Sequence, residues 1–136
     1  MSNSIEQATA CYERYKTAFN ARDIEGMVAV MHFPHRRLSG DNRFEVWETA
    51  NEYRASRGEA MTASLSAEGW SHTATTSIEA VQSGADKVHL ALNHSRRRAG
   101  GSEYNAFATL WIFTRIEGRW GIQFRSSFLS EAASPL

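Results

Sequence analysis

The chain has 136 residues, of which 42% are hydrophobic and 22% are charged, and its 15 Lys and Arg residues balance its 15 Asp and Glu residues. This length fits one domain, residues 1–136, with enough chain to bury a real core. A formal net charge of zero gives no long-range attraction to anionic partners, so we expect binding neither to nucleic acid nor to a membrane. The single cysteine, Cys11, cannot form an internal disulfide, and no leader-like or long apolar run is present, so we expect a cytoplasmic protein.

Helical spacing of apolar residues marks the first part of the chain. A capping-box pattern at Ser4 predicts a helix that ends near Asn20. Asp23 is the expected N-cap of a short second helix, and Pro34 stops that helical pattern. A second capping-box pattern at Thr49 predicts a third helix of roughly four turns.

The remaining segments alternate with the period of a β-strand. A hairpin is predicted from Arg37 to Trp47, with a polar turn at residues 39–42. Four long strands are predicted at residues 70–82, 87–97, 104–116 and 119–128. This order indicates an α+β fold, in which three N-terminal helices pack in the concave face of a strongly curved, mainly antiparallel mixed sheet of about six strands. The mouth of such a cone would form a small-molecule pocket.

The predicted strand at 104–116 is apolar on both faces. One face carries Ala106, Ala108, Leu110 and Ile112, and the other carries Phe107, Trp111 and Phe113. An antiparallel sheet with one face in water would show polar residues on that face. We therefore expect the face with Trp111 to cover the helices, and the face with Leu110 to bind a second copy of the chain. The sequence thus predicts a homodimer through the outer sheet face.

Two segments of the chain resemble a known superfamily. Residues 14–31 read RYKTAFNARDIEGMVAVM, which resembles the two-helix opening of the nuclear transport factor 2-like superfamily, and residues 117–128 read EGRWGIQFRSSF, which is similar to its last hairpin. The superfamily includes ketosteroid isomerases, SnoaL-like polyketide cyclases and limonene epoxide hydrolases. The resemblance covers nearly the whole chain and implies a cystatin-like cone. It implies no single activity, because proteins with this scaffold have many different activities and some have none.

The resemblance to ketosteroid isomerases extends to one of their functional residues. Those enzymes use a tyrosine of the first helix as an oxyanion donor, and Tyr15 stands at the matching place. Their general-base aspartate corresponds to Ser39 here, and their second oxyanion donor, a neutral aspartic acid, falls close to Trp111. The indole N–H of Trp111 can donate a hydrogen bond but cannot titrate. Steroid isomerisation by that mechanism is therefore not expected, and the Asp-Arg-Asp set of limonene epoxide hydrolases has no match.

His35 is the candidate that could replace the missing base. The comparison with the family places His35 and Arg37 on the pocket side, and an unperturbed histidine pKa of about 6.5 suits proton transfer. In the alternative interpretation, His35 only borders the pocket, while His32 caps the C-terminus of the second helix. Pro34 prevents the helical spacing that would aim both histidine rings at one ion, so no metal site is expected.

Arginines provide further candidates. Arg125 interrupts an apolar-rich strand and could hold a carboxylate with two N–H groups, although Glu117 or Glu103 could equally pair with it. The consecutive arginines at residues 96–98 precede a Gly-Gly turn, where a solvated rim is the commoner outcome.

Two functions from different classes remain possible. The favoured one is binding of a small, largely apolar molecule without catalysis. The residues expected to bind it are Tyr15, His35, Arg37, Trp47, Trp111 and Phe128. The alternative is a cofactor-independent isomerase, cyclase or dehydratase, with His35 as the base and Tyr15 and Trp111 as oxyanion donors. No nucleotide-binding loop, nucleophile elbow or zinc helix is present, so neither function implies a cofactor.

Overall fold

The structure, a computed structural model, describes residues 3–129, with the side chains of residues 59 and 62 excepted. The elements in chain order are α1 (Ser4–Asn20), α2 (Ile24–Val28), β1 (Met31–Leu38), β2 (Phe44–Trp47), α3 (Ala50–Ala67), β3 (His72–Ser83), β4 (Lys87–Arg97), β5 (Glu103–Ile116) and β6 (Arg119–Ser127). The predicted order of helix, helix, hairpin, helix and four strands is therefore confirmed. No helix in the described part of the chain is long and apolar enough to cross a membrane.

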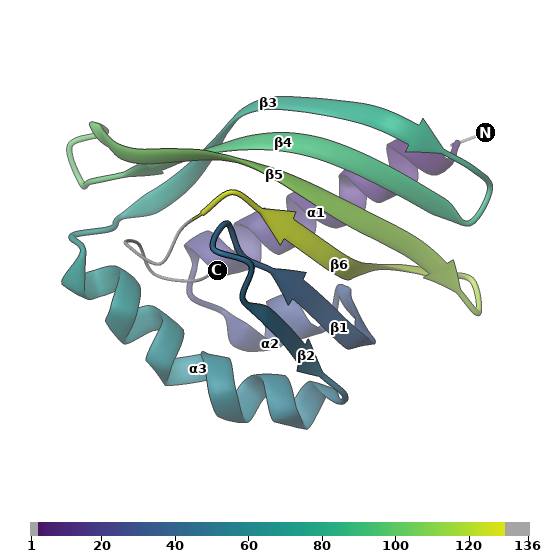
Figure 1. The fold of residues 1–136 in the computed structure, drawn as a ribbon, viewed down its shortest axis with the longest axis horizontal. Coiled ribbons are helices and arrows are strands. Elements are labelled where there is room, and N and C mark those ends of the chain that lie inside the picture. Colours follow the sequence, from purple (N-terminus) through teal and green to yellow (C-terminus); the bar gives the residue numbers. More distant parts are fainter. Residues whose placement is uncertain (1–2, 130–136) are drawn as a thin grey trace.

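The six strands form one mixed sheet in the order β2-β1-β6-β5-β4-β3. Only β1 and β6 pair in parallel; the other neighbours are antiparallel. Helix α1 crosses behind the strands in Figure 1 and contacts β3, β4 and β6. The α+β fold with three helices and a mixed six-stranded sheet is thus confirmed. Strong curvature is not established, because the sheet is open, with β2 and β3 as its edges.

Side-chain caps begin the helices where the sequence suggested. The side chain of Asp23 accepts a hydrogen bond of 3.0 Å from the Gly26 backbone N–H at the start of α2. Thr49 caps α3 in the same way by accepting from the Glu52 N–H at 3.2 Å. At α1 the cap is Asn3, one residue before the predicted Ser4. These contacts satisfy N–H groups that a helix cannot pair internally.

Strand β1 differs from its prediction, because it begins at Met31 rather than at Arg37. Helix α2 ends at Val28, which leaves Pro34 within the strand. The pairing of β1 with β6 shifts its register between Met31 and Arg36, and a proline is tolerated at such an irregularity because it has no N–H to donate.

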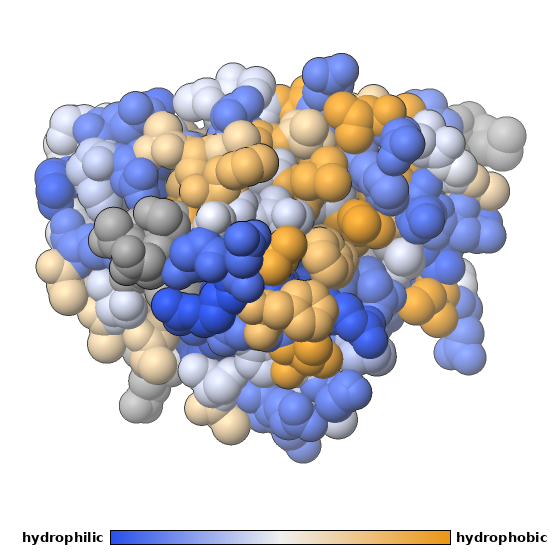
Figure 2. Space-filling model, in the orientation of Figure 1, coloured by the Kyte–Doolittle hydropathy of each residue, from blue (hydrophilic) through white to orange (hydrophobic). Residues whose placement is uncertain are grey.

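The two faces of β5 divide as expected. Phe107, Trp111 and Phe113 are buried on the face that meets the helices, which we call the inner face. On the opposite, outer face, Ala106 and Ala108 are exposed, and Leu110 and Ile112 are half-buried. The outer face is toward the viewer in Figure 2, where hydrophobic atoms gather over the middle of the sheet.

Candidate functional site

The guanidinium of Arg125 lies at the centre of the inner face and is 1% exposed. Its Nε donates to His35 Nε2 over 3.1 Å, and its Nη1 donates to the Tyr15 hydroxyl over 3.1 Å. Its Nη2 donates to the Tyr53 hydroxyl over a longer 3.5 Å. These three partners come from β1, α1 and α3, so one side chain of β6 connects three other elements.

The partners of Arg125 are neutral groups. The Nδ1 of His35 donates to the Ile122 carbonyl oxygen at 3.1 Å, which leaves Nε2 as the acceptor for Arg125. Burial and the charge of Arg125 hold the pKa of His35 well below its ordinary value, so the ring carries no charge at neutral pH. Burial likewise raises the pKa of the Tyr15 phenol. Within the described residues, no carboxylate forms an ion pair with Arg125.

Aromatic rings provide the remaining contacts of the guanidinium. The guanidinium carbon lies 5.5 Å from the centre of the Trp111 ring and 5.7 Å from that of Tyr15. Such cation–π contacts are worth about 0.5–2 kcal/mol each and compensate only part of the cost of removing a charge from water.

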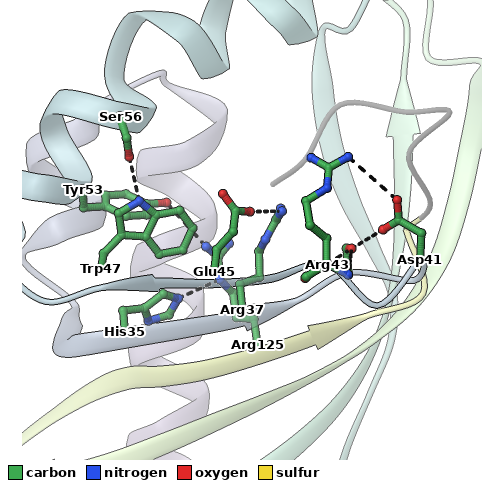
Figure 3. Close-up of polar contacts among 10 residues, drawn as sticks. His35, Arg37, Asp41, Arg43, Glu45, Trp47, Tyr53, Ser56 and Arg125 are labelled. Atoms are coloured by element: carbon green, nitrogen blue, oxygen red, sulfur yellow. Dashed lines mark hydrogen bonds and ion pairs between the residues drawn. The ribbon is translucent and has the colours of Figure 1, made fainter.

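A second arginine lies beside Arg125 on the inner face. The strand registers place Glu45 opposite Arg37 and Arg37 opposite Arg125, so the three side chains form a row across β2, β1 and β6 (Figure 3). Arg37 donates from Nη2 to Glu45 Oε1. Burial, followed by repulsion from Arg125, lowers the pKa of Arg37 to about 10. The carboxylate of Glu45 is therefore bonded to Arg37, the arginine nearer the edge of the sheet, and not to Arg125.

Trp47 encloses this row on the side of α3. Its Nε1–H donates to Ser56 Oγ over 2.6 Å, and its ring meets the Tyr53 ring edge to face at 5.1 Å between centroids (Figure 3). The centre of the His35 ring lies 6.0 Å from that of Trp47, and Figure 3 shows it on the side opposite to Ser56. Trp47 therefore shields His35 and Tyr53 from solvent.

A cavity of about 20 Å³ lies beside Arg125, which is room for about one water molecule. Its lining residues are Tyr12, Tyr15, Lys16, Phe19, Thr73, His94, Trp111 and Arg125. The side chain of Lys16 is 30% exposed, whereas Arg125 is buried, so the cavity extends from a rim at Lys16 to an inner end at Arg125.

His94 adds a polar group to the wall of this cavity. Its Nε2 is 3.1 Å from the Tyr12 hydroxyl, which also contacts Thr75 Oγ1. The ring is 4% exposed, and its Nδ1 has no hydrogen-bond partner among the described residues. Burial, with the charges of Arg125 and Arg96, lowers the pKa of His94 to about 3, so the ring is neutral at ordinary pH.

The structure brings five of the six predicted site residues to the inner face. These are Tyr15, His35, Arg37, Trp47 and Trp111, all of them buried. The sixth, Phe128, was expected to line the pocket but is 74% exposed. Strand β6 ends at Ser127, and its alternation, with Arg125 facing inward, would in any case direct Phe128 outward.

The polar atoms expected to act in catalysis are already engaged. The Nε1–H of Trp111 donates to Thr109 Oγ1 over 3.0 Å. The unprotonated nitrogen of His35 accepts from Arg125, and His35 does not line the cavity. Proton abstraction by His35 would therefore require Arg125 to move first.

His32 does not cap α2, as one interpretation of the sequence suggested. It lies on β1, where its Nε2 donates to the Arg119 carbonyl oxygen at 2.9 Å and its Nδ1 accepts from the Arg119 guanidinium at 3.0 Å. The Gly121 backbone packs so closely against the ring that a Cβ atom there would lie 2.7 Å from His32 Cδ2.

Arg96 was expected to lie on a solvated rim, and this prediction is wrong. It is fully buried, pairs with Glu68 at 3.2 Å and lies over the ring of Phe107. The period of β4 explains this placement, because Leu92, His94 and Arg96 follow one another at every second position and face inward. The same alternation along residues 87–97 directs His94 inward, which is a signal that could have placed it at the site.

Among residues 3–129, no group of three or more His, Cys, Asp or Glu side chains is placed to hold an ion. The inner face instead combines guanidinium, hydroxyl and imidazole groups with aromatic rings, which suits recognition of an organic molecule.

The protein has three helices on one face of an open, mixed six-stranded sheet, and polar side chains are enclosed between the two layers. This arrangement is that of a cystatin-like α+β protein. The chain belongs to the NTF2-like protein family DUF6841, whose profile matches residues 6–125. The resemblance seen in the sequence is thereby confirmed. A search of curated proteins found no match.

Solved structures agree with this fold. A protein of unknown function with a cystatin-like fold from Nostoc punctiforme has 11% sequence identity and a TM-score of 0.69, with 93% of each chain covered. An NTF2-like protein from Novosphingobium aromaticivorans has 18% identity and a TM-score of 0.69, covering 94% of this chain and 84% of the other. A ketosteroid isomerase-like protein from Erwinia carotovora atroseptica has 19% identity and a TM-score of 0.67, with 93% and 96% covered. At these identities the similarity establishes the fold alone.

Proposed function

We propose that the protein binds a small, largely apolar molecule on the inner face beside Arg125, and that it does so as a homodimer. The main support is the cavity between α1 and the sheet, because aromatic rings form much of its wall while polar atoms of Arg125 and His94 meet there. Pockets for small molecules typically combine an apolar wall with a few polar groups that set orientation.

The size of the cavity implies that binding moves its rim. At about 20 Å³ it is far smaller than the roughly 300–1,000 Å³ of typical ligand pockets. Lys16 and Phe19 line it from α1, and Thr73 lines it from β3. A ligand larger than water would therefore enter by displacing side chains at this rim, while Arg125 and its buried partners stay in place.

Binding is favoured over an isomerase, cyclase or dehydratase because the catalytic groups of that alternative are occupied. His35 would have to lose its bond from Arg125, and Trp111 its bond to Thr109, before either could act on a substrate. The histidine that does line the cavity, His94, has a pKa of about 3 and is a weak base at neutral pH.

The homodimer would form through the outer face. Strand registers place Ile112 opposite Phe124 and Leu38 opposite Phe44, so apolar side chains pair across β5 and β6 and again across β1 and β2. Arg36 lies opposite Phe124, between these two apolar pairs. Phe44 is 55% exposed. Apolar side chains exposed on one face of a sheet are typical of a protein interface, and a two-fold contact would cover the same patch on both copies.

The binding proposal can be tested without knowing the natural ligand. Native mass spectrometry of the purified protein would detect a molecule that co-purifies, and ligand-observed NMR would measure binding of indole and p-cresol. We expect at least one probe to bind with a millimolar or tighter Kd, and Lys16→Trp at the rim to weaken it at least tenfold. The matched variant Lys87→Trp, at the exposed start of β4, should leave the Kd unchanged.

Two results would contradict the proposal. If no molecule co-purifies and neither probe binds, the inner face is not a binding site. If Lys16→Trp and Lys87→Trp bind a probe as tightly as the wild type, binding occurs elsewhere on the protein.

A further inference from the structure

Among the described residues, no carboxylate forms an ion pair with Arg125, although the charge of Glu45 helps to raise the pKa of Arg125 from a greater distance. The guanidinium is 1% exposed, and all three of its hydrogen-bond acceptors are neutral. An ion transferred from water to a protein interior without an opposite charge costs several kcal/mol. The inner-face carboxylate of Glu45 is bonded to Arg37 instead. An anion from outside the chain would compensate the buried charge.

Arg125 also has hydrogen-bonding capacity left for such an anion. A guanidinium has five N–H donors, and the contacts to His35, Tyr15 and Tyr53 use three of them. Two N–H groups remain. Because Arg125 lines the cavity, a carboxylate at its inner end could accept from them, which is the pairing that guanidinium groups favour.

His94 provides a second donor at the same cavity. A neutral imidazole carries one proton, and when the Tyr12 hydroxyl donates to Nε2, that proton is on Nδ1. The Nδ1 atom is buried and has no partner among the described residues. An N–H group in this position lacks an acceptor, and a carboxylate oxygen would supply one.

The charges around the cavity have one sign. Lys16 lies at the rim and Arg125 at the inner end, and the lining includes no Asp or Glu side chain. The carboxylate of Glu13 does pair with Lys16 at 3.0 Å, but its side chain is 52% exposed and lies outside the cavity. A cavity with cationic groups and no anionic ones attracts anions and disfavours cations.

We propose that the molecule bound at this site is a small monocarboxylate with an apolar body, its carboxylate paired with Arg125 and within reach of His94. The apolar body lies among Phe19, Tyr15 and Trp111. This inference rests on the proposed function, since it names the charge and class of the ligand of that same site. An inorganic anion also carries a negative charge, so the test must distinguish a monocarboxylate from an inorganic anion.

The test compares benzoate with benzamide, which has nearly the same shape without the charge. Calorimetry at constant ionic strength would give the Kd of each for the wild type and for Arg125→Met. We expect the wild type to bind benzoate at least tenfold more tightly than benzamide, and Arg125→Met to bind the two within about twofold. The matched variant Arg115→Met removes an exposed arginine of β5 and should keep the wild-type preference.

A second variant covers the case in which Arg125→Met does not fold. Lys16→Met lies at the rim, outside the bonded cluster around Arg125, and should reduce the preference for benzoate about threefold with little loss of thermal stability. An unchanged preference in Lys16→Met would count against the inference. Sodium chloride and phosphate serve as inorganic probes, and each should fail to displace benzoate at a tenfold molar excess.

The outcomes distinguish the two proposals. If benzamide binds the wild type as tightly as benzoate, the ligand needs no carboxylate, and only the binding of an apolar molecule stands. If chloride or phosphate displaces benzoate, the site holds an inorganic anion, and the monocarboxylate assignment is wrong. If none of the probes binds and no molecule co-purifies, the proposed function itself fails.

Discussion

Mild acid should destabilise the protein through His94. Its pKa is about 3 in the folded chain, because of burial and the charges of Arg125, Arg96 and Lys16, whereas an unfolded histidine titrates at about 6.5. The folded pKa is the lower one, so between these values the unfolded state binds the extra proton. The stability is therefore fully present above pH about 6.5 and is lost as the pH falls toward 3.

The size of the effect follows from this difference in pKa. Each pH unit within the window costs about 1.4 kcal/mol, so acidification from pH 7.5 to 5 removes about 2 kcal/mol through His94. His35, whose pKa burial and Arg125 also hold well below its ordinary value, should act in the same direction. The loss of about 2 kcal/mol through His94 alone is a considerable part of the 5–15 kcal/mol by which a domain is usually stable.

Urea denaturation followed by circular dichroism, at pH 7.5, 6.5, 5.5 and 5.0, would measure the free energy of unfolding. We expect His94→Gln to lose about 2 kcal/mol less than the wild type between the highest and lowest pH. Leu92→Ala, a buried neighbour on the same face of β4, should lower the free energy of unfolding by about 2–5 kcal/mol at every pH without changing the slope. If His94→Gln keeps the wild-type slope, His94 is not a buried neutral group and the reasoning is refuted.

Three further predictions concern other parts of the molecule. Leu110→Glu on the outer face should convert the proposed dimer into a monomer, whereas Ala85→Glu in the β3–β4 turn should leave it a dimer. Light scattering would measure the mass of both variants. A wild type that is monomeric at micromolar concentration would rule out the dimer. Burial raises the pKa of the Cys11 thiol to about 11, so iodoacetamide should label it only as the chain unfolds, and labelling at the rate of a free thiol would contradict this. Gly121→Ala should cost about 1–3 kcal/mol in urea denaturation, because its Cβ would meet the His32 ring at 2.7 Å; unchanged stability would mean that the ring moves aside easily.

Local patterns predicted most of the fold correctly, because each reports on a contact made nearby in the sequence. The caps at Asp23 and Thr49 bond N–H groups three residues away. The alternation along β5 separates Trp111 from Leu110 because successive side chains of a strand point to opposite faces. The family resemblance then implied the cystatin-like arrangement of the helices and the sheet.

The partners of Arg125 could not be predicted in this way. Tyr15, Tyr53 and His35 are 110, 72 and 90 residues distant in the sequence, so no local spacing indicates them. From the sequence, Arg125 was expected either to hold the carboxylate of a ligand or to pair with Glu117 or Glu103, because buried charges are usually paired. That rule fails here, where the arginine bonds neutral groups.

The parallel pair β1–β6 also determines when the sheet can be completed. Met31 lies opposite Ile122, and these residues are separated by most of the described chain. Until β6 has been synthesised, β1 and β5 both have an unpaired edge, and the hairpin of β1 and β2 has no sheet to join. Pairings between such distant residues close late and slow folding. A nascent chain that lacks β6 therefore presents two open strand edges in addition to those of β2 and β3, a condition that favours aggregation and the need for a chaperone.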